Sequence, residues 1–195
     1  MIENIETKRI LIVISSPSGA GKTSVCKKLL ELDGELRASI SVTTRKPRNN
    51  ETNGIDYIFI SKEDFDKKIS NGEFLEYANV FNNKYGTLAS STKDLLNKNF
   101  DVLFDIDWQG TQQLSHFEEL NLIKFFLVPP DKKELEKRLI QRNQDESDVI
   151  IKRLKAYDND IIHWSDYDHV IINDNLDHCF NQIEKIINET KKKNN

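Results

Sequence analysis

A glycine-rich segment near the start of the chain has the residue types and spacing of a loop that binds polyphosphate. Gly19 and Gly21 have no Cβ, so the backbone can curl there with its N–H groups pointing at an anion. Lys22 would reach the outer phosphates of a nucleoside triphosphate, and the Thr23 hydroxyl would be offered to Mg²⁺. An apolar run at residues 10–14 and a helical pattern after the loop complete the strand–loop–helix context of this motif. The residues expected to hold the triphosphate are Ser16, Pro17, Ser18, Gly19, Ala20, Gly21, Lys22, Thr23 and Ser24.

One residue of this loop departs from the general pattern. The pattern begins with glycine, and this chain has Ser16 at that position, where a small residue still fits. The alternative interpretation is a glycine-rich turn that binds nothing. The flanking strand and helix patterns, together with Lys22 and Thr23, favour the phosphate-binding interpretation.

A second group of polar residues follows the loop and suggests a second anion. Arg45 and Arg48 surround a proline-containing turn, and guanidinium groups are suited to bidentate contacts with phosphate. Glu51 and Tyr57 come shortly after them. A solvated turn would also carry two arginines, but the nearby phosphate loop favours a binding role.

Three carboxylates are placed where a ligand could use them. Asp105 and Asp107 come at the end of the apolar run 102–106, and open α/β sheets hold their ligands at such strand ends. Buried carboxylates also need partners. Glu76, in the segment Phe-Leu-Glu, would on its own more often be a surface residue.

Taken together, these segments resemble the guanylate kinase family, of the compact bacterial type. The resemblance covers nearly the whole chain and rests on motifs in the family's order and spacing: the phosphate loop, Thr-Thr-Arg-x-Pro-Arg, Phe-Leu-Glu, Tyr-Gly-Thr and Asp-Ile-Asp-Trp-Gln-Gly. It implies a Mg²⁺-dependent transfer of the γ-phosphoryl group of ATP to GMP in purine nucleotide metabolism, giving ADP and GDP. Small bacterial members often begin their loop with Ala or Ser, which fits Ser16.

The resemblance also implies roles for individual residues. Asn173 follows the last expected strand, in a segment that resembles the family's loop beside the adenine of ATP, although an ordinary turn is a rival interpretation. Asp105 is expected to join Thr23 at the metal, directly or through a water molecule, or to brace the loop. The implied catalytic residues are Lys22, Arg45, Arg142 and Arg153. The implied GMP-binding residues are Ser41, Arg45, Arg48, Glu51, Tyr57, Glu76, Tyr85, Thr87 and Asp107.

The chemistry of these side chains favours guanine independently of the resemblance. Carboxylates such as Glu76 and Asp107 can accept hydrogen bonds from guanine N1–H and its 2-amino group, while the Ser41 hydroxyl can donate to O6. Adenine would present its N1 lone pair to a carboxylate, acceptor against acceptor. Sites built on hydrogen bonds reject an analogue that leaves them unpaired by as much as ~10⁴–10⁵.

A polar, arginine-bearing region late in the chain resembles the family's mobile lid. Arg138 and Arg142 lie on one expected helix and Arg153 on the next, and Arg142 and Arg153 correspond to the arginines that close over the ATP phosphates. The family usually has Gly-Thr after the first of these arginines, and this chain has Asn143-Gln144. We expect the hinge to persist, with an altered opening rate.

The pattern of apolar runs predicts the architecture. Runs at residues 10–14, 102–106, 123–128 and 170–172 alternate with helical stretches, which indicates βα units and a mainly parallel sheet. With the resemblance, this predicts an α/β phosphate-loop nucleoside-monophosphate-kinase fold with a five-stranded core sheet. The expected parts are a core at about 8–38, 100–135 and 156–195, an inserted, partly antiparallel GMP-binding lobe at about 39–92, and a helical lid at about 136–155.

Local signals predict several boundaries within this architecture. Helices are expected to open at Ser61, Ser91 and Asp131, the last with Leu135, Leu139 and Ile140 on one apolar face. Short strands are expected at 39–43, 57–60 and 73–77 within the lobe. Turns are expected at Asn53-Gly54 and at Tyr85-Gly86.

Composition limits the partners. The formal net charge of −4 argues against bulk binding of nucleic acid, and no apolar run approaches the ~20 residues that span a bilayer. A polar N-terminal segment, two cysteines and four histidines without metal-ligand spacing predict a cytoplasmic protein with neither a disulfide framework nor a zinc site. The expected partners are ATP and GMP, and the sequence does not determine the oligomeric state.

Other functions are open at this stage. A kinase for a different nucleoside monophosphate is the nearest rival. A non-catalytic guanylate-kinase-like interaction module would show a degraded phosphate loop, which this chain does not have. A regulatory GTPase would carry a guanine-reading Asn-Lys-x-Asp segment late in the chain, and the Asn-Asp-Asn at 173–175 does not supply it.

Overall fold

The core of the protein is a parallel sheet with five strands. The computed structural model describes residues 8–141 and 147–194. Every neighbouring pair in this sheet is parallel, and the strand order is β2-β7-β1-β8-β9. The strands are β1 (Leu11–Ser15), β2 (Leu36–Ala38), β7 (Asp101–Asp105), β8 (Leu122–Val128) and β9 (His169–Ile172). The predicted α/β class with a five-stranded core sheet is therefore confirmed.

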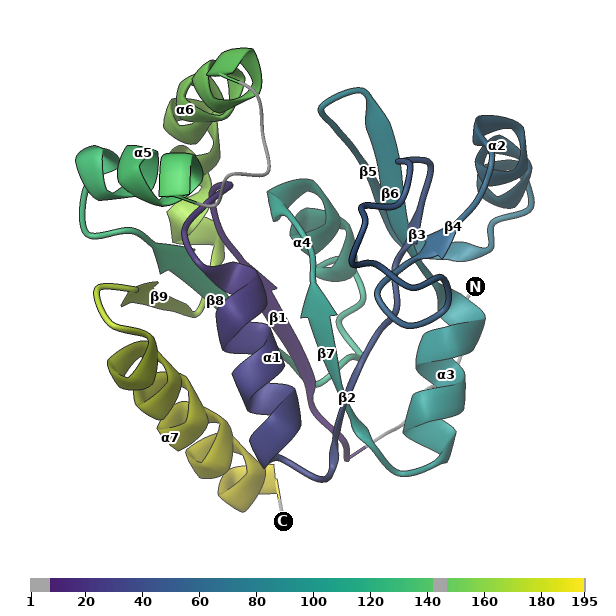
Figure 1. The fold of residues 1–195 in the computed structure, drawn as a ribbon. Helices are drawn as coiled ribbons and strands as arrows, with labels where there is room; N and C mark the ends of the chain where they lie inside the picture. The colour runs from purple at the N-terminus through teal and green to yellow at the C-terminus, as the bar shows by residue number, and fades with distance from the viewer. Residues whose placement is uncertain (1–7, 142–146, 195) are drawn as a thin grey trace.

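Helices cover both faces of this sheet (Figure 1). One face packs against α1 (Lys22–Leu32) and α7 (Leu176–Asn194) through a core cluster that includes Leu29 and Ile183. The other face packs against α3 (Ala89–Asn97) and α4 (Trp108–Leu114). Burial on both sides explains why the central strand β1 is a continuous apolar run instead of an alternating one.

A second, smaller sheet stands beside the carboxyl ends of the core strands. Its order is β4-β3-β6-β5, formed by β3 (Val42–Thr43), β4 (Ile58–Phe59), β5 (Phe74–Val80) and β6 (Asn83–Leu88). Pairs β3–β6 and β5–β6 are antiparallel. This sheet and α2 (Lys62–Ser70) are called the lobe below. On the other side of the same edge lie α5 (Lys132–Gln141), α6 (Ser147–Ile161) and the short 3₁₀ helix η1 (Ile162–Asp166) (Figure 1).

Two helix starts follow their capping signals. The Ser61 hydroxyl accepts a hydrogen bond from the Asp64 N–H at 3.0 Å and caps α2, and Asp131 accepts one from the Glu134 N–H at 2.7 Å at the start of α5. Both predicted starts are confirmed. Helix α2 ends at its C-cap Asn71, and Gly72 follows with φ of 65°, a left-handed conformation that suits a helix end.

The predicted start of α3 at Ser91 is wrong. The helix begins at Ala89, directly after β6, and its N-cap is Leu88 with no side-chain cap. Strand and helix are continuous there, so no capping residue marks the junction. Ile140 is also misplaced by the sequence pattern, because it is 57% exposed while Leu135 and Leu139 on the same helix are buried.

The predicted turn at Tyr85 and Gly86 is wrong as well, because both residues lie inside β6. A Cβ on Gly86 would stand 2.9 Å from the carbonyl oxygen of Glu76 and 2.9 Å from the Phe74 ring, so the glycine allows close strand packing. The hairpin actually turns at Phe81 and Asn82, which have φ of 48° and 66°. Neither residue is a glycine, which explains why the pattern gave no turn signal there.

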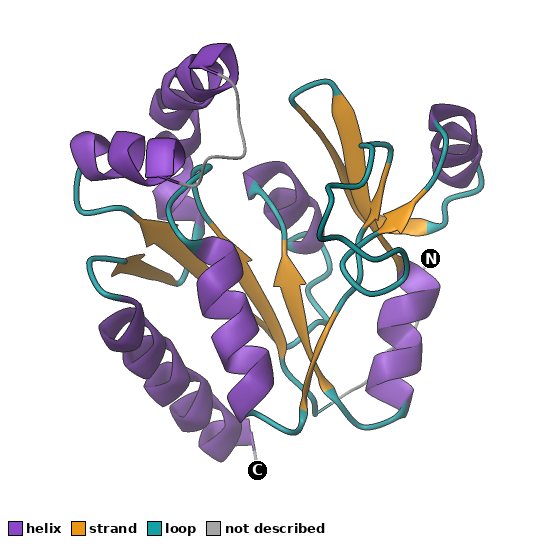
Figure 2. Cartoon of the chain, in the orientation of Figure 1, coloured by secondary structure: helices purple, strands orange, loops and turns teal. Residues whose placement is uncertain are grey.

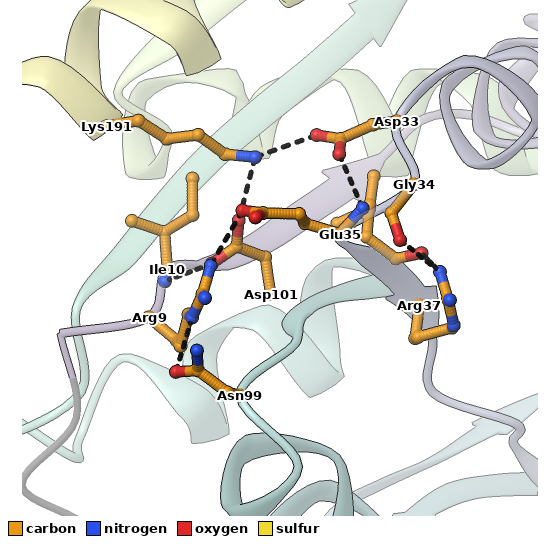
Figure 3. Close-up of polar contacts among 10 residues, drawn as sticks. Arg9, Ile10, Asp33, Gly34, Glu35, Arg37, Asn99, Asp101 and Lys191 are labelled. Atoms are coloured by element: carbon orange, nitrogen blue, oxygen red, sulfur yellow. Dashed lines mark hydrogen bonds and ion pairs between the residues drawn. The ribbon is translucent and has the colours of Figure 1, made fainter.

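The amino end of the core sheet is closed by a network of charged side chains around Asp101 (Figure 3). Asp101 is 2% exposed; its Oδ1 accepts a hydrogen bond from the Ile10 N–H at 3.0 Å, and its Oδ2 lies 2.8 Å from Lys191 Nζ. Lys191 also contacts Asp33 at 2.8 Å, and Arg9 pairs with Glu35 at 2.9 Å. This network ties α7 to the α1–β2 connection and to the starts of β1 and β7.

Candidate active site

A cleft of about 800 Å³ opens at the carboxyl ends of the core strands, bounded by the phosphate loop, the lobe and α6. Figure 2 shows the connections that follow β1 and β7 at this same end of the sheet. Ligand sites of open α/β sheets lie at such strand ends. We call the part lined by residues 16–24 the loop end and the part lined by Ser41, Arg45, Arg48, Tyr57, Glu76 and Tyr85 the lobe end.

At the loop end, the backbone adopts the curled conformation that the two glycines allow. Gly19 and Gly21 have φ of 94° and 97°, a left-handed conformation that other residues rarely adopt. A Cβ on Gly19 would lie 2.8 Å from Leu139 of α5, so that helix packs directly beneath the loop. The N-terminus of α1 follows and presents its N–H groups to the cleft, as anion-binding helices do.

Lys22 is held at the loop end by a charged partner. Its Nζ donates a hydrogen bond to Asp105 at the end of β7 and lies 3.3 Å from the carbonyl oxygen of Ile106. Burial by itself would lower the pKa of Lys22, but the neighbouring Asp105 carboxylate outweighs burial and raises the pKa above its ordinary value. The lysine therefore remains a cation throughout the neutral range.

At the lobe end, Glu51 organises the two arginines. Its carboxylate accepts hydrogen bonds from the Arg45 guanidinium at 2.8 and 2.9 Å and from the Arg48 N–H at 2.8 Å. The Tyr57 ring centroid lies 5.2 Å from Arg45 Cζ and 6.1 Å from the Tyr85 ring. The hydrogen bond from Arg45 holds the pKa of Glu51 below its ordinary value. The result is a cationic wall whose charges are fixed in position.

Deeper in the lobe end lies a buried carboxylate with an unused oxygen. Glu76 is 3% exposed, and its Oε1 has no hydrogen-bond partner among the described residues. Thr87, which pairs with Glu76 across the β5–β6 ladder, has a buried hydroxyl in the same state. Burial, reinforced by the nearby charge of Asp107, raises the pKa of Glu76 to about 7. A Cβ on Gly110 would stand 2.2 Å from Glu76 Oε2, so this carboxylate fits only against a glycine.

Asp107 performs two tasks at the start of α4. It is the N-cap, accepting a hydrogen bond from the Gly110 N–H at 3.1 Å, and its other oxygen accepts one from Gln109 Nε2 at 3.0 Å. Burial raises the pKa of Asp107 above its ordinary value. Because Asp107 also lines the cleft, the helix cap presents a carboxylate toward the same space as Glu76.

One acidic residue that lines the cleft, Asp160, is not among the residues predicted from the sequence. Asp160 of α6 lines the cleft, and burial together with the charge of Asp107 raises its pKa to about 6. Beside it, the Trp108 and His163 rings stack with centroids 3.7 Å apart. A signal existed, because Arg153, Ala156 and Asp160 follow the i, i+3, i+7 spacing of one helix face.

Of the three arginines in the expected lid region, the structure describes Arg138 and Arg153. Arg153 Nη1 donates a hydrogen bond to the Ser18 hydroxyl, and the Arg153 Cζ lies 5.5 Å from the ring centroid of Phe81 at the β5–β6 turn. Arg138 lines the cleft and pairs with Glu134 at 3.0 Å. Arg142, like Asn143 and Gln144, lies outside the described residues.

The structure brings most of the sequence-predicted residues to this one cleft. Four of them stand behind its wall instead of lining it: Ala20, Glu51, Thr87 and Asn173. Glu51 contacts the arginines, and Thr87 lies against Glu76. Asn173 lies behind the phosphate loop, where its amide contacts the backbone.

The oxygen donors at the loop end fit a magnesium ion that arrives with a nucleotide. The Thr23 hydroxyl and the Asp105 carboxylate both line the cleft there. Mg²⁺ is usually bound by one or two protein oxygens together with water and substrate phosphates, not by a full protein cage. In agreement, residues 8–141 and 147–194 contain no group of three His, Cys, Asp or Glu side chains that could hold a metal alone.

Fold and site together define a phosphate-loop α/β protein in which a second anion-binding lobe faces the loop. The chain belongs to the guanylate kinase family, since the family model described as Guanylate kinase matches residues 8–190. It is similar to the guanylate kinase of Rickettsia bellii, with 44% identity over 190 residues that cover 97% of this chain and 99% of the relative. The guanylate kinase of Zymomonas mobilis is also 44% identical, over 91% of this chain and 82% of its own length.

Solved structures agree with this assignment. The crystal structure of guanylate kinase from Anaplasma phagocytophilum superimposes with a TM-score of 0.79 at 33% sequence identity, covering 95% of this chain and 88% of that chain. The membership that the sequence motifs predicted is thereby confirmed. No helix in the described part of the chain is long and apolar enough to cross a membrane.

Proposed function

We propose that the chain transfers the γ-phosphoryl group of ATP to GMP, with ADP and GDP as the products. The loop end of the cleft takes the ATP phosphates, and the lobe end takes GMP. Membership of the guanylate kinase family supports this reaction. The observation that carries the base assignment is Glu76 Oε1, an acceptor buried in the lobe end that has no hydrogen-bond partner within residues 8–141 and 147–194.

Guanine supplies the donors that this acceptor lacks. In this proposal Glu76 and Asp107 accept hydrogen bonds from N1–H and the 2-amino group, while the Ser41 hydroxyl donates to O6. Both carboxylates have raised pKa values in the free protein because they are buried, and the charge of Asp107 raises the pKa of Glu76 further. Donors from guanine would favour their charged forms and lower those pKa values. Adenine would instead present a lone pair to a buried carboxylate.

The proposed mechanism is a direct in-line transfer without a covalent intermediate. The attacking oxygen belongs to the GMP phosphate, which is mostly dianionic at neutral pH because its second pKa is about 6. The residues must align two anions that repel each other and neutralise the charge that develops between them. Lys22 and Arg153 face the donor phosphates, the resemblance to the family assigns Arg142 to the same phosphates, and Arg45 and Arg48 hold the acceptor phosphate. Thr23 and Asp105 would hold Mg²⁺, which would supply positive charge to offset that of the ATP phosphates.

A coupled assay of ADP release tests this proposal. GMP, dGMP, AMP, CMP and UMP are supplied in parallel with MgATP, and initial rates are compared. We expect strong turnover with GMP and at least a thousandfold lower kcat/KM with AMP, in keeping with rejection by unpaired hydrogen-bonding groups of ~10⁴ or more. Turnover with AMP or UMP and none with GMP would refute the base assignment. No turnover with any acceptor, while ATP and GMP still bind, would refute catalysis.

A further inference from the structure

Asn173 is anchored to the core sheet at the point where the sheet meets the phosphate loop. It directly follows β9, and its backbone N–H donates a hydrogen bond to the carbonyl oxygen of Val128 at 2.8 Å, which extends the β8–β9 pairing. Its side chain is 4% exposed and does not line the cleft. Asn173 is thus a buried amide that is held in place by the backbone of β8.

The amide reaches across to the backbone of the loop. Nδ2 donates a hydrogen bond of 2.7 Å to the carbonyl oxygen of Ala20, a residue 153 positions earlier in the chain. It also lies against the next residue, because a Cβ on Gly21 would stand only 2.3 Å from this nitrogen. Gly21 therefore serves two purposes, the positive φ of the loop and the close approach of the Asn173 amide.

This contact fixes the orientation of one peptide group. The Ala20 carbonyl and the Gly21 N–H belong to the same planar trans peptide, so they point in opposite directions. Holding the carbonyl toward Asn173, behind the loop, turns the Gly21 N–H toward the cleft, which Gly21 lines. This N–H has no acceptor among the described residues, so it is available to an anion.

We infer that Asn173 is a positioning residue that locks the Ala20–Gly21 peptide so that the Gly21 N–H faces the phosphates of the bound triphosphate. The inference deepens the proposed function and rests on it in one respect, that the loop end takes a triphosphate. It differs from a direct contact between Asn173 and adenine, because the effect on affinity passes through the loop and does not depend on the base.

The test compares ligands with and without a base. Affinities of Asn173→Ala for MgATP and for inorganic tripolyphosphate are measured by titration calorimetry, together with KM values for ATP and GMP. We expect both affinities to fall by about the same factor, roughly tenfold for the loss of one buried hydrogen bond, with KM for GMP changed less than twofold. Asn173→Asp should lose more, because it sets a carboxylate against the Ala20 carbonyl oxygen.

A neighbouring asparagine supplies the control. Asn175 Oδ1 accepts hydrogen bonds from the Asp177 and His178 N–H groups at 2.9 and 3.1 Å, which caps α7, and no hydrogen bond between Asn175 and residues 16–24 is present in the described part of the chain. Asn175→Ala should lower the unfolding temperature and leave the tripolyphosphate affinity unchanged. An unchanged GMP affinity in Asn173→Ala shows that this variant is folded.

The remaining outcomes separate the inference from the proposed function. Weaker binding of MgATP with unchanged tripolyphosphate affinity would assign Asn173 to the base and overturn the inference. Unchanged affinity for both ligands would overturn it as well, and leave the proposed function standing. If the unaltered protein bound neither MgATP nor tripolyphosphate, the proposed function would fail, and the inference with it.

Discussion

At the scale of single residues, the buried Glu76 provides an acceptor for a ligand but lowers the stability of the folded protein when it is ionised. Its carboxyl is buried, Oε1 has no partner in the part of the chain that the structure describes, and burial raises the pKa to about 7 from an ordinary value of 4.5. The unfolded chain therefore ionises this group more readily than the folded protein does. As the pH rises from 4.5 through 7, the folded state loses stability relative to the unfolded state. The same buried acceptor is what we propose guanine recognises.

Replacing this carboxyl by an amide should raise the stability of the protein and weaken its use of GMP. We expect Glu76→Gln without ligand to unfold at a higher temperature than the unaltered protein at pH 8, with a gain of up to about 3 kcal/mol, and to differ little at pH 4.5. Its kcat/KM for GMP should fall at least about a hundredfold, because the amide can set a donor against guanine N1–H. Thermal unfolding at both pH values and the coupled assay measure these effects.

Glu73→Gln is the matched control for this prediction. Glu73 directly precedes β5, and hydrogen bonds from Lys68 and Asn71 hold its pKa below its ordinary value. The amide there should not stabilise the protein at pH 8. A Glu76→Gln variant that is less stable than the unaltered protein at pH 8 would contradict the account of Glu76.

Lys22 and Lys28 both lie on α1, but of the two only Lys22 lines the cleft, so comparing their alanine variants tests whether turnover depends on the charge at the loop. Lys22→Ala removes the cation beside Asp105, and we expect turnover to fall by about 10³ while the fold persists. Lys28 pairs with Asp177 of α7 away from the cleft, so Lys28→Ala should keep near-normal turnover. Steady-state rates and circular dichroism check both variants. Near-normal turnover in Lys22→Ala would remove this lysine from the mechanism.

The chemistry-bearing residues differ in how far the sequence could identify them. Lys22 and Arg45 lie in short motifs whose spacing itself expresses the local geometry, so residue types were enough to select them. Asp160 shares a helix face with Arg153, which is a signal in the sequence, whereas Phe81 reaches the cleft from a hairpin turn, and only the packing of distant elements brings it there. Asn173 contacts the Ala20 carbonyl oxygen behind the phosphate loop, and this contact depends on the fold and gives no signal in the sequence.

At the scale of elements, local signals succeeded where one residue determines a boundary. Ser61 caps α2 because its hydroxyl satisfies a free N–H group, and that chemistry can be read in sequence. The start of α3 and the true hairpin turn gave no such signal, since Leu88 caps nothing and Phe81 and Asn82 take positive φ without glycine. The glycine at position 86 predicts a turn, but Gly86 lies inside β6, where it allows β5 and β6 to pack closely.

The β5–β6 hairpin contacts α6 through Phe81, which joins the lobe to the expected lid. The Phe81 ring lies 5.5 Å from the Arg153 guanidinium, and a cation–π contact of this kind is worth about 0.5–2 kcal/mol. We expect Phe81→Leu to lower kcat about threefold to tenfold, because Arg153 loses one of its supports. Phe81→Tyr keeps an aromatic ring and should stay within twofold. Equal losses in the two variants would assign the effect to the backbone of the turn.

At the scale of the whole molecule, the two ends of the core sheet have separate tasks. The carboxyl end carries the cleft, in which every wall comes from a different part of the chain. The amino end carries the charged network around Asp101, which joins the first strand, the α1–β2 connection and the last helix (Figure 3). A change at the amino end should therefore act on stability and leave binding at the carboxyl end unaltered.

Asp101 provides the test of this separation. Asp101→Ala leaves the Ile10 N–H without its buried acceptor and removes one of the two carboxylates that Lys191 contacts, which should cost about 1–3 kcal/mol. Combining it with Lys191→Met should add to that loss, because Asp33 then loses its partner as well. KM for ATP and for GMP should stay within twofold in both variants. Glu35→Ala, which removes an exposed partner of Arg9, should cost less than about 1 kcal/mol. A shift in either KM caused by Asp101→Ala would show that the two ends of the sheet are coupled.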